Sequence, residues 1–379
     1  MWFEVPASTD SSSVILLEVK GPIGPATVDY VERSLEHAKS RKTTLLILQL
    51  DTPGGLDVSM REIIQQLITS PVPVVTYVAP SGARAASAGT YILYASHIAA
   101  MAPGTNLGAA TPVQLGASPV PEVPDSSEDN SSVSGSSAME RKIINDAEAY
   151  LRSLAQLRGR NVEWAVEAVR EGASLSAEEA LQQNVIDLIA AHVPDLLAQL
   201  DGREVQLIHE KHVLHTSGLT VKRIEPDWRN ELLSLITNPN VAYVLMLIGI
   251  YGLIFEFATP GTLLPGIVGA VSLVLSLYAF QVLPISYAGL ALMLFGLALM
   301  IAEAFAPSFG VLGIGGGLVF IIGSIFLMDT DAPGYGLSPV LVGVLGVANL
   351  AFFAFVLGLV FLARNRPVVS GAQTMVGSM

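Results

Sequence analysis

Ser87 stands among small residues in the stretch SGARAASAGTY, residues 81–91. The neighbours of Ser87 are Ala86 and Ala88, and small neighbours let a substrate backbone approach a hydroxyl closely. If Ser87 lies where a strand turns into a helix, the N–H of Ala88 points the same way as the hydroxyl, as in a nucleophile elbow. The same small residues would also let a helix pack tightly on a strand without any chemistry, so both interpretations stay open.

A second candidate is the turn LDTPGG, residues 50–55. Its glycines leave backbone N–H groups uncovered at the start of a predicted helix, where partial positive charge favours an anion. The alternative is a tight turn that needs glycine only for a positive φ. Together the two loops could supply a two-donor oxyanion hole, the group that usually contributes most to acyl-transfer catalysis.

These two loops follow predicted strands of an α/β domain. Apolar runs predict strands at 13–21, 43–51, 72–79 and 97–103, and amphipathic patterns predict helices at 26–41, 57–70 and from about Ala85. Alternation of strands and helices at this spacing indicates a parallel sheet. Ligands of such sheets bind beyond the carboxyl ends of the strands, which is where both loops fall.

The second half has the composition of a membrane domain. The chain is 51% hydrophobic and 14% charged with a mean hydropathy of +0.54, which is too apolar for a soluble protein of this length. A spanning helix needs about 20 apolar residues. We expect five spans, separated by Pro- and Gly-rich breaks, at Val241–Phe257, Leu263–Val282, Tyr287–Phe305, Gly310–Met328 and Pro339–Ala363.

Charge and residue usage exclude several classes of function. The first 240 residues carry a net charge of −11, which argues against nucleic-acid binding because phosphates need a basic patch. The lack of cysteine excludes disulfides and a thiolate nucleophile. His209, His212 and His215 are spaced so that one strand face cannot hold all three, and we expect neither a metal site nor a cofactor.

The membrane half contains a repeat with a spacing of 47 residues. Glu256 begins the first copy and Glu303 begins the second. Four further positions follow at the same spacing, and only the middle one of the five differs in residue type: Pro260, Leu263, Gly266 and Gly269 in the first copy, and Pro307, Gly310, Gly313 and Gly316 in the second. An acid inside a membrane is a functional candidate. At a helix end it can instead reach interfacial water, and we favour that interpretation.

The order of DTPGG and AASAGTY resembles the ClpP-like serine peptidase domain of the membrane-bound NfeD proteins. The blocks APGTNLGAATPV (102–113), RSLAQLRGRN (152–161) and NPNVAYVLMLIGIYGLIFEFATPG (238–261) extend the resemblance over nearly the whole chain. It implies a ClpP/crotonase-like α/β domain at 1–235 and an all-α multi-pass transmembrane domain at 236–365. Family members usually continue into a small OB-like barrel, and residues 366–379 look like its first strand cut short.

The resemblance also implies the base. ClpP pairs its serine with a downstream histidine, but the matching region here reads AATPV. His97 is the only nearby histidine, and it would lie about 15 Å along a helix that continued from Ser87. The resemblance to the NfeD peptidases implies a Ser–Lys dyad instead. Its lysine lies near the start of the helix that follows a variable loop, and the matching residue here is Lys142 in MERKIINDAEAYLRSLAQ.

The helix pattern places Lys142 at the border of the core. Its apolar stripe is formed by Ile143, Ala147, Tyr150 and Leu154. Desolvation in an apolar cleft favours the neutral amine, which is the form that can accept the serine proton. Residues 114–140 before it are rich in Ser, Pro and acids, and we expect a flexible loop that is either a lid or a plain surface insertion.

We therefore expect a membrane-anchored serine endopeptidase in which Lys142 deprotonates Ser87 and the N–H groups of Gly55 and Ala88 hold the oxyanion. The resemblance implies apolar segments of membrane-associated proteins as substrates, stomatin-like (SPFH) partners, and a homodimer or higher oligomer. Two alternatives stay open: a crotonase-type acyl-CoA enzyme, and a non-catalytic scaffold that assembles with stomatin- or flotillin-like proteins.

The location follows in part from charge. MWFEVPASTDSSS, residues 1–13, lacks the basic and apolar regions of a signal peptide. ARNRP after the last span suits the cytoplasm, but Lys222, Arg223 and Arg229 before the first span nearly balance the charge rule. The resemblance places the peptidase outside the cytoplasm and the C-terminus inside.

Overall fold

The computed structural model describes residues 13–112, 134–207, 210–258, 263–306, 310–328 and 334–364, together with residues 261 and 308. Two compact units divide the chain. The first comprises residues 1–282 with 330–335, and the second comprises residues 283–329 with 336–379. The first unit contains an α/β domain and two apolar helices, and the second contains three further apolar helices.

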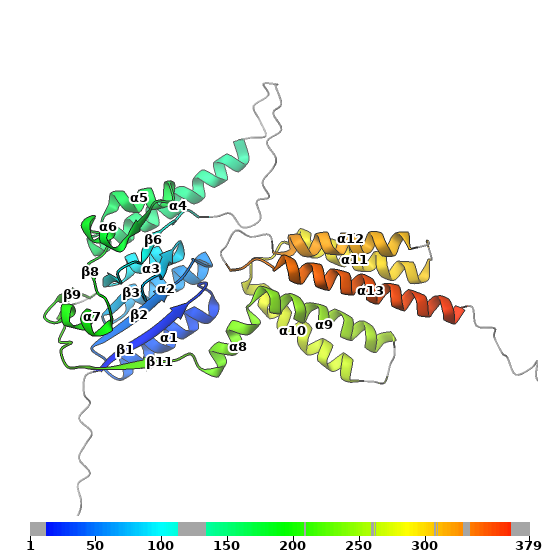
Figure 1. Ribbon diagram of the computed structural model, residues 1–379, viewed down its shortest axis with the longest axis horizontal. Helices are drawn as coiled ribbons and strands as arrows, with labels where there is room; N and C mark the ends of the chain where they lie inside the picture. Colours follow the sequence, from blue (N-terminus) through cyan, green and yellow to red (C-terminus); the bar gives the residue numbers. More distant parts are fainter. Residues whose placement is uncertain are drawn as a thin grey trace, which may run out of the picture. The chain divides into compact units, whose positions relative to one another are not determined.

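A six-stranded parallel sheet forms the centre of the α/β domain (Figure 1). In spatial order its strands are β11 (Thr220–Ile224), β1 (Ser13–Lys20), β2 (Leu45–Asp51), β3 (Val74–Val78), β5 (Ile98–Met101) and β8 (Leu188–Ile189). The runs of β2 and β3 are apolar on both faces and almost wholly buried, as parallel strands covered on both sides require. The predicted α/β class with a parallel sheet is confirmed.

Helices cover the sheet on both faces. The helices of the domain are α1 (Pro25–Ser40), α2 (Asp57–Thr69), α3 (Ala88–Ala95), α4 (Ser134–Arg158), α5 (Val162–Arg170), α6 (Ala177–Gln182), α7 (Val193–Leu200) and α8 (Trp228–Ile236). Successive strand residues point to opposite faces. Leu46 and Leu48 pack with α1 to α5 in one core, whereas Leu45 and Ile47 pack with α7 in the other.

Two small sheets complete the domain. One contains β4 (Arg84–Ala86), β6 (Asn106–Gly108) and β7 (Ser174–Ser176), and the other contains β9 (Glu204–Gln206) and β10 (Lys211–Val213). The predicted helix start at about Ala85 is wrong, because residues 84–86 pair with β6 and bridge to Thr52 instead. The helix therefore begins only after Ser87, at Ala88.

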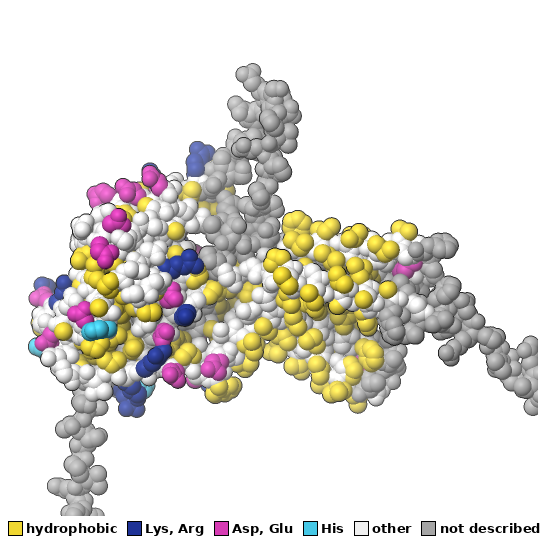
Figure 2. Space-filling model, in the orientation of Figure 1, with side chains coloured by type: hydrophobic (Ala, Val, Ile, Leu, Met, Phe, Trp, Pro, Cys, Tyr) yellow, Lys and Arg dark blue, Asp and Glu magenta, His cyan; other side chains and the backbone are white. Residues whose placement is uncertain are grey.

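Five apolar helices occupy the ranges of the five predicted spans: α9 (Pro239–Ala258), α10 (Leu264–Val282), α11 (Tyr287–Phe305), α12 (Val311–Leu327) and α13 (Pro339–Arg364). On the face that the space-filling view shows, apolar side chains gather over the region of these helices (Figure 2). Among the described residues, Pro239–Phe257 and Leu264–Val282 are long and apolar enough to cross a bilayer, and the other three helices contribute shorter apolar stretches.

The repeated glutamates bind the start of the next helix. Glu303 is buried, and its carboxylate accepts backbone N–H groups of Ser308 at 2.8 Å, Gly310 at 2.9 Å and Leu312 at 3.1 Å. The first N–H groups of a helix lack partners within the helix, so this carboxylate satisfies donors at the start of α12. The expectation that Glu303 reaches interfacial water is wrong for this reason.

Glu256 has the corresponding place in the first copy. Its carboxylate accepts the N–H of Gly261 at 3.3 Å in the turn before α10. A Cβ added to Gly266 would lie 2.8 Å from Cγ of Glu256, so only glycine leaves room for this acid. The 47-residue repeat thus encodes two helical hairpins, α9 with α10 and α11 with α12, each closed by its own glutamate.

Candidate active site

Ser87 occupies a strained turn between β4 and α3. Its φ of 51° and ψ of −116° lie in a region that residues other than glycine rarely adopt. Two hydrogen bonds hold it there: its N–H donates to the carbonyl of Gly108 and its carbonyl accepts the N–H of Thr90, each at 2.9 Å. A sharp strand-to-helix turn that presents a serine is the geometry of a nucleophile elbow.

The DTPGG turn lies directly against this serine. A Cβ added to Gly54 would lie 2.8 Å from Cβ of Ser87 and 3.2 Å from its Oγ. The carbonyl of Gly54 accepts the N–H of Ile23 at 2.8 Å, and the N–H of Leu56 donates to the carbonyl of Ile23 at 2.9 Å. These two hydrogen bonds form a parallel bridge that holds residues 54–56 against Ile23. In such a bridge the N–H of the middle residue, Gly55, is directed away from Ile23.

The N–H groups of Gly55 and Ala88, the two proposed oxyanion donors, bind nothing within the part of the chain that the structure describes. Ala88 is the first residue of α3, where an N–H has no partner within the helix. Among the hydrogen bonds of the described residues, none uses the N–H of Gly55 or of Ala88. Each of the two loops that the sequence singled out therefore offers a backbone donor that has no partner among the described residues.

The four predicted site residues line one cavity of about 550 Å³. These residues are Gly55, Ser87, Ala88 and Lys142. Most of the remaining wall is apolar and is formed by Leu56, Met60, Tyr91, Ala110, Pro112, Met139, Ile143 and Ala147. The cavity can accept an apolar side chain beside the serine hydroxyl.

Lys142 projects into this cavity region from α4 but is exposed. The predicted stripe is confirmed from Ala147 onward, where Ala147 and Leu154 are buried in the core. The first turns of α4 extend beyond that core, so the expected desolvation of Lys142 is wrong for this structure. Residues 114–133 of the predicted loop lie outside the described residues, and its end, from Ser134, belongs to α4.

An ion-paired arginine at the cavity was missed by the sequence analysis. Arg61 donates from Nε to Asp57 and from an Nη to Asp146, each at 2.8 Å. Its guanidinium carbon lies 4.4 Å from the ring centroid of Tyr150, a cation–π distance. The Asp57–Arg61 spacing of one helical turn could have indicated the first pair, whereas Asp146 comes from a helix distant in sequence.

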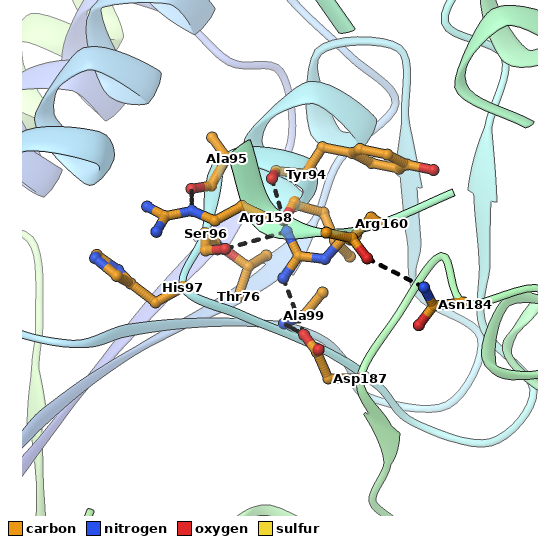
Figure 3. Close-up of polar contacts among 12 residues, drawn as sticks. Thr76, Tyr94, Ala95, Ser96, His97, Ala99, Arg158, Arg160, Asn184 and Asp187 are labelled. Carbon is orange, nitrogen blue, oxygen red and sulfur yellow. Dashed lines mark hydrogen bonds and ion pairs between the residues drawn. The ribbon is translucent and has the colours of Figure 1, made fainter. Parts of the chain in front are cut away.

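A second arginine holds the far end of the serine helix (Figure 3). The side chain of Arg160 is 3% exposed and donates to Asp187 at 2.9 Å. It also donates to the carbonyls of Leu93 at 3.3 Å, Tyr94 at 2.6 Å and Ser96 at 3.1 Å. Because the last carbonyls of a helix lack partners within the helix, Arg160 caps the C-terminus of α3.

His97 lies beside this cap, in the same close-up, and does not belong to the described lining of the cavity. Its Nδ1 accepts the N–H of Val74 at 3.3 Å. Burial, together with the charges of Arg158 and Arg160, lowers the pKa of His97 to about 3. His97 is thus a neutral buried side chain, and its place outside the described lining of the cavity agrees with its exclusion as the base of Ser87.

Two family models match the chain in succession. The NfeD1b N-terminal domain matches residues 13–209, and the NfeD integral membrane domain matches residues 240–371. Among curated proteins, the membrane-bound protease PH1510 of Pyrococcus horikoshii is 36% identical over 372 residues, covering 96% of this chain and 81% of its own length. The membrane protein NfeD1b of Bacillus subtilis is 26% identical over 341 residues, covering 86% and 69%.

Solved structures match the α/β domain. A lysine-to-alanine mutant of the 1510-N membrane-bound stomatin-specific protease, in complex with a substrate peptide, has a TM-score of 0.52 and 34% identity, covering 60% of this chain and 98% of that one. A serine-to-alanine mutant of the same protease has a TM-score of 0.50 and 35% identity, covering 57% and 99%. The resemblance inferred from the sequence is confirmed: this chain belongs to the NfeD family, with an NfeD1b-type N-terminal domain followed by an NfeD integral membrane domain.

Proposed function

We propose that this chain is a membrane-bound serine endopeptidase in which Ser87 is the nucleophile and Lys142 is its base. The observation that carries the proposal is the shared cavity, which brings Ser87, Lys142 and the free N–H groups of Gly55 and Ala88 together. The similarity to a membrane-bound protease over 96% of the chain supports it. Two solved structures of a relative also support it, because one carries a lysine-to-alanine replacement and the other a serine-to-alanine replacement.

The reaction needs only residues of this cavity. The neutral amine of Lys142 takes the proton of Ser87 while Oγ forms a bond to the scissile carbonyl carbon. The carbonyl oxygen becomes an oxyanion that accepts the N–H groups of Gly55 and Ala88. When the peptide C–N bond breaks, the Lys142 ammonium returns the proton to the leaving amine. Water, deprotonated by the same lysine, then attacks the acyl carbon, the bond to Oγ breaks, and the Lys142 ammonium returns its proton to Oγ of Ser87.

The exposure of Lys142 suits this sequence of events. A peptide seated on Ser87 would fill the cavity that Lys142 lines, and it would therefore exclude water from the amine. Loss of water favours the neutral form of a lysine, which is the reactive one. The desolvation that the sequence predicted for the free protein is thus proposed to arise on substrate binding.

We propose apolar segments of membrane-associated proteins as the substrates. The apolar wall formed by residues such as Leu56, Met60 and Ile143 supports this choice. The solved relative is described as stomatin-specific, so a stomatin homologue is the proposed partner. We further propose domain boundaries near residues 235 and 365, a homodimer or higher oligomer, an extracytoplasmic peptidase domain and a cytoplasmic C-terminus.

The test compares the full chain, purified in detergent, with Ser87→Ala and Lys142→Ala on an apolar peptide. We expect each variant to lose about 10³-fold or more in kcat, since members of a catalytic pair act as a unit. Lys39→Ala is the matched control, because this exposed lysine lies away from the cavity, and it should retain wild-type activity. Cleavage by both cavity variants would refute the dyad. An inert wild type that still binds a stomatin homologue would favour the scaffold.

A further inference from the structure

The cavity contains more charge than a Ser–Lys pair requires. Asp57, Arg61 and Asp146 all line it, together with Lys142. Arg61 lies between the two acids, with Nε 2.8 Å from Oδ2 of Asp57 and an Nη 2.8 Å from Oδ2 of Asp146. Its side chain is 39% exposed, so it joins α2 to α4 at the rim of the cavity and not in the core.

Asp146 is one helical turn from the proposed base. Residues four apart on a helix lie on the same face, so Lys142 and Asp146 are neighbours on the side of α4 that lines the cavity. An aspartate left free at this spacing forms an ion pair with a lysine. Such a pair favours the ammonium form, which cannot accept a proton from serine.

We propose that Arg61 is a positioning residue for the Lys142 base: it binds both acids of the cavity, so that neither forms an ion pair with the lysine amine. The inference rests on the proposed function, because it matters only if Lys142 accepts a proton. Arg61 acts through Asp57 and Asp146, and no contact between Arg61 and substrate is required.

The other groups around Lys142 support this arrangement. From α3, Tyr91 faces the cavity, and burial raises its pKa, so it stays an uncharged phenol that donates to the carbonyl of Ala110 at 3.0 Å. From α4, burial also raises the pKa of Tyr150. Arg141 adjoins Lys142 in sequence and has its own interaction. In the described lining of the cavity, Asp57 and Asp146 are thus the carboxylates that compete for the lysine.

An arginine suits the position better than a lysine would. The planar guanidinium presents donors at fixed angles, so one side chain can hold two acids at once while its flat face lies on Tyr150. The ring of Tyr150 in turn stacks on Tyr91, with centroids 6.1 Å apart. This stack relates the orientation of Arg61 to α3, which follows Ser87, and to α4, which carries Lys142.

The experiment measures kcat/KM against pH for the full chain on an apolar peptide. In Arg61→Gln we expect the acidic limb to move up by about one pH unit, since a freed carboxylate favours the ammonium. On that limb the rate falls about tenfold, while the rate at high pH is retained. Asp146→Asn should move the limb downward. The double variant Arg61→Gln/Asp146→Asn should return it close to wild type. Arg203→Gln, an exposed arginine away from the cavity, is the control.

A second readout does not depend on peptidase activity. In a Ser87→Ala background, the rate at which a small amine-acylating reagent labels Lys142 is followed against pH by mass spectrometry. Adding Arg61→Gln should move that profile upward by a similar amount, even if the protein cleaves no peptide. Failure of the proposed function therefore appears in the first assay alone.

Three results would overturn the inference. The first is an Arg61→Gln variant that loses activity equally at every pH, which would mean that Arg61 only supports the fold. The second is a double variant that keeps the Arg61→Gln profile. The third is an unchanged labelling profile. If Arg61→Gln does not fold, Asp146→Asn alone still decides, because an unshifted acidic limb in that variant contradicts the proposal.

Discussion

Replacing Arg160 by methionine would remove the cap of the serine helix while keeping most of the apolar stem. The guanidinium of Arg160 makes four hydrogen bonds, three to carbonyls at the end of α3 and one to Asp187. Because the substitution changes only this side chain and keeps most of its apolar stem, the measured loss of unfolding free energy reports on the cap.

The magnitude follows from burial. Removing one partner of a buried ion pair costs about 3–5 kcal/mol, because the other partner is left without compensation. The side chain of Asp187 is 34% exposed and still accepts the N–H of Ala99 at 2.7 Å, so it is partly solvated. We therefore expect the lower end, about 3 kcal/mol of unfolding free energy. For a domain of this size that corresponds to a fall in Tm of about 6–12 °C.

Trp164 is a suitable reporter. It is buried, and its ring stacks on Tyr94 with centroids 5.9 Å apart, next to the carbonyl that Arg160 binds. Thermal unfolding of the full chain can thus be followed by tryptophan fluorescence. Arg203→Met is the control, because the side chain of Arg203 is exposed and, among the described residues, its hydrogen bond is a long one of 3.4 Å to the carbonyl of Asp187. A fall in Tm below about 2 °C for Arg160→Met, or an equal fall for both variants, would refute the reasoning.

Two further predictions concern His97 and Gly54. Because the folded pKa of His97 is about 3 and the unfolded value is about 6.5, only the unfolded chain binds this proton between those values. The unfolding free energy should therefore fall by about 2 kcal/mol from pH 7 to pH 5. In melting curves recorded at several pH values, His97→Asn should show a weaker pH dependence. If the variant shows an equally steep dependence, the proton is bound by other groups. Gly54→Ala should lower kcat at least tenfold, since its Cβ would press on Ser87. Gly104→Ala also places alanine at a positive φ, at a backbone cost of about 1–3 kcal/mol, but there is open space around its new methyl group. Equal peptidase rates in these two variants would contradict the proposed contact.

The Ser87 turn could be predicted because its signals are local. A buried apolar strand, a short run of small residues and the following helix are contiguous, and the DTPGG turn ends the neighbouring strand of the same sheet. The strand β4 was missed because its partners, β6 and the bridge at Thr52, are not adjacent to it in the sequence. Three residues carry too little pattern to reveal such pairing.

Other parts of the site depend on long-range contacts. Lys142 was found through family resemblance, since a lysine on an amphipathic helix has no local mark of a base. Arg61 and Asp146 look like ordinary surface charges in the sequence, and only the packing of α2 beside α4 pairs them. Arg160 binds carbonyls, which every residue has, so no spacing of side chains could indicate its role.

The glutamate that closes each helical hairpin also bears on how the chain enters a bilayer. A backbone N–H without a partner costs several kcal/mol in hydrocarbon, and Glu303 supplies those partners within the turn itself. We therefore expect α11 and α12 to insert as one pair during synthesis, with both ends of the pair left on the side from which it entered. Tags placed before Tyr287 and after Met328 should then be labelled from the same side of the membrane, and Glu303→Ala should break that agreement. On this view the 47-residue repeat is the length of one insertion step, and α9 with α10 and α11 with α12 are two such steps.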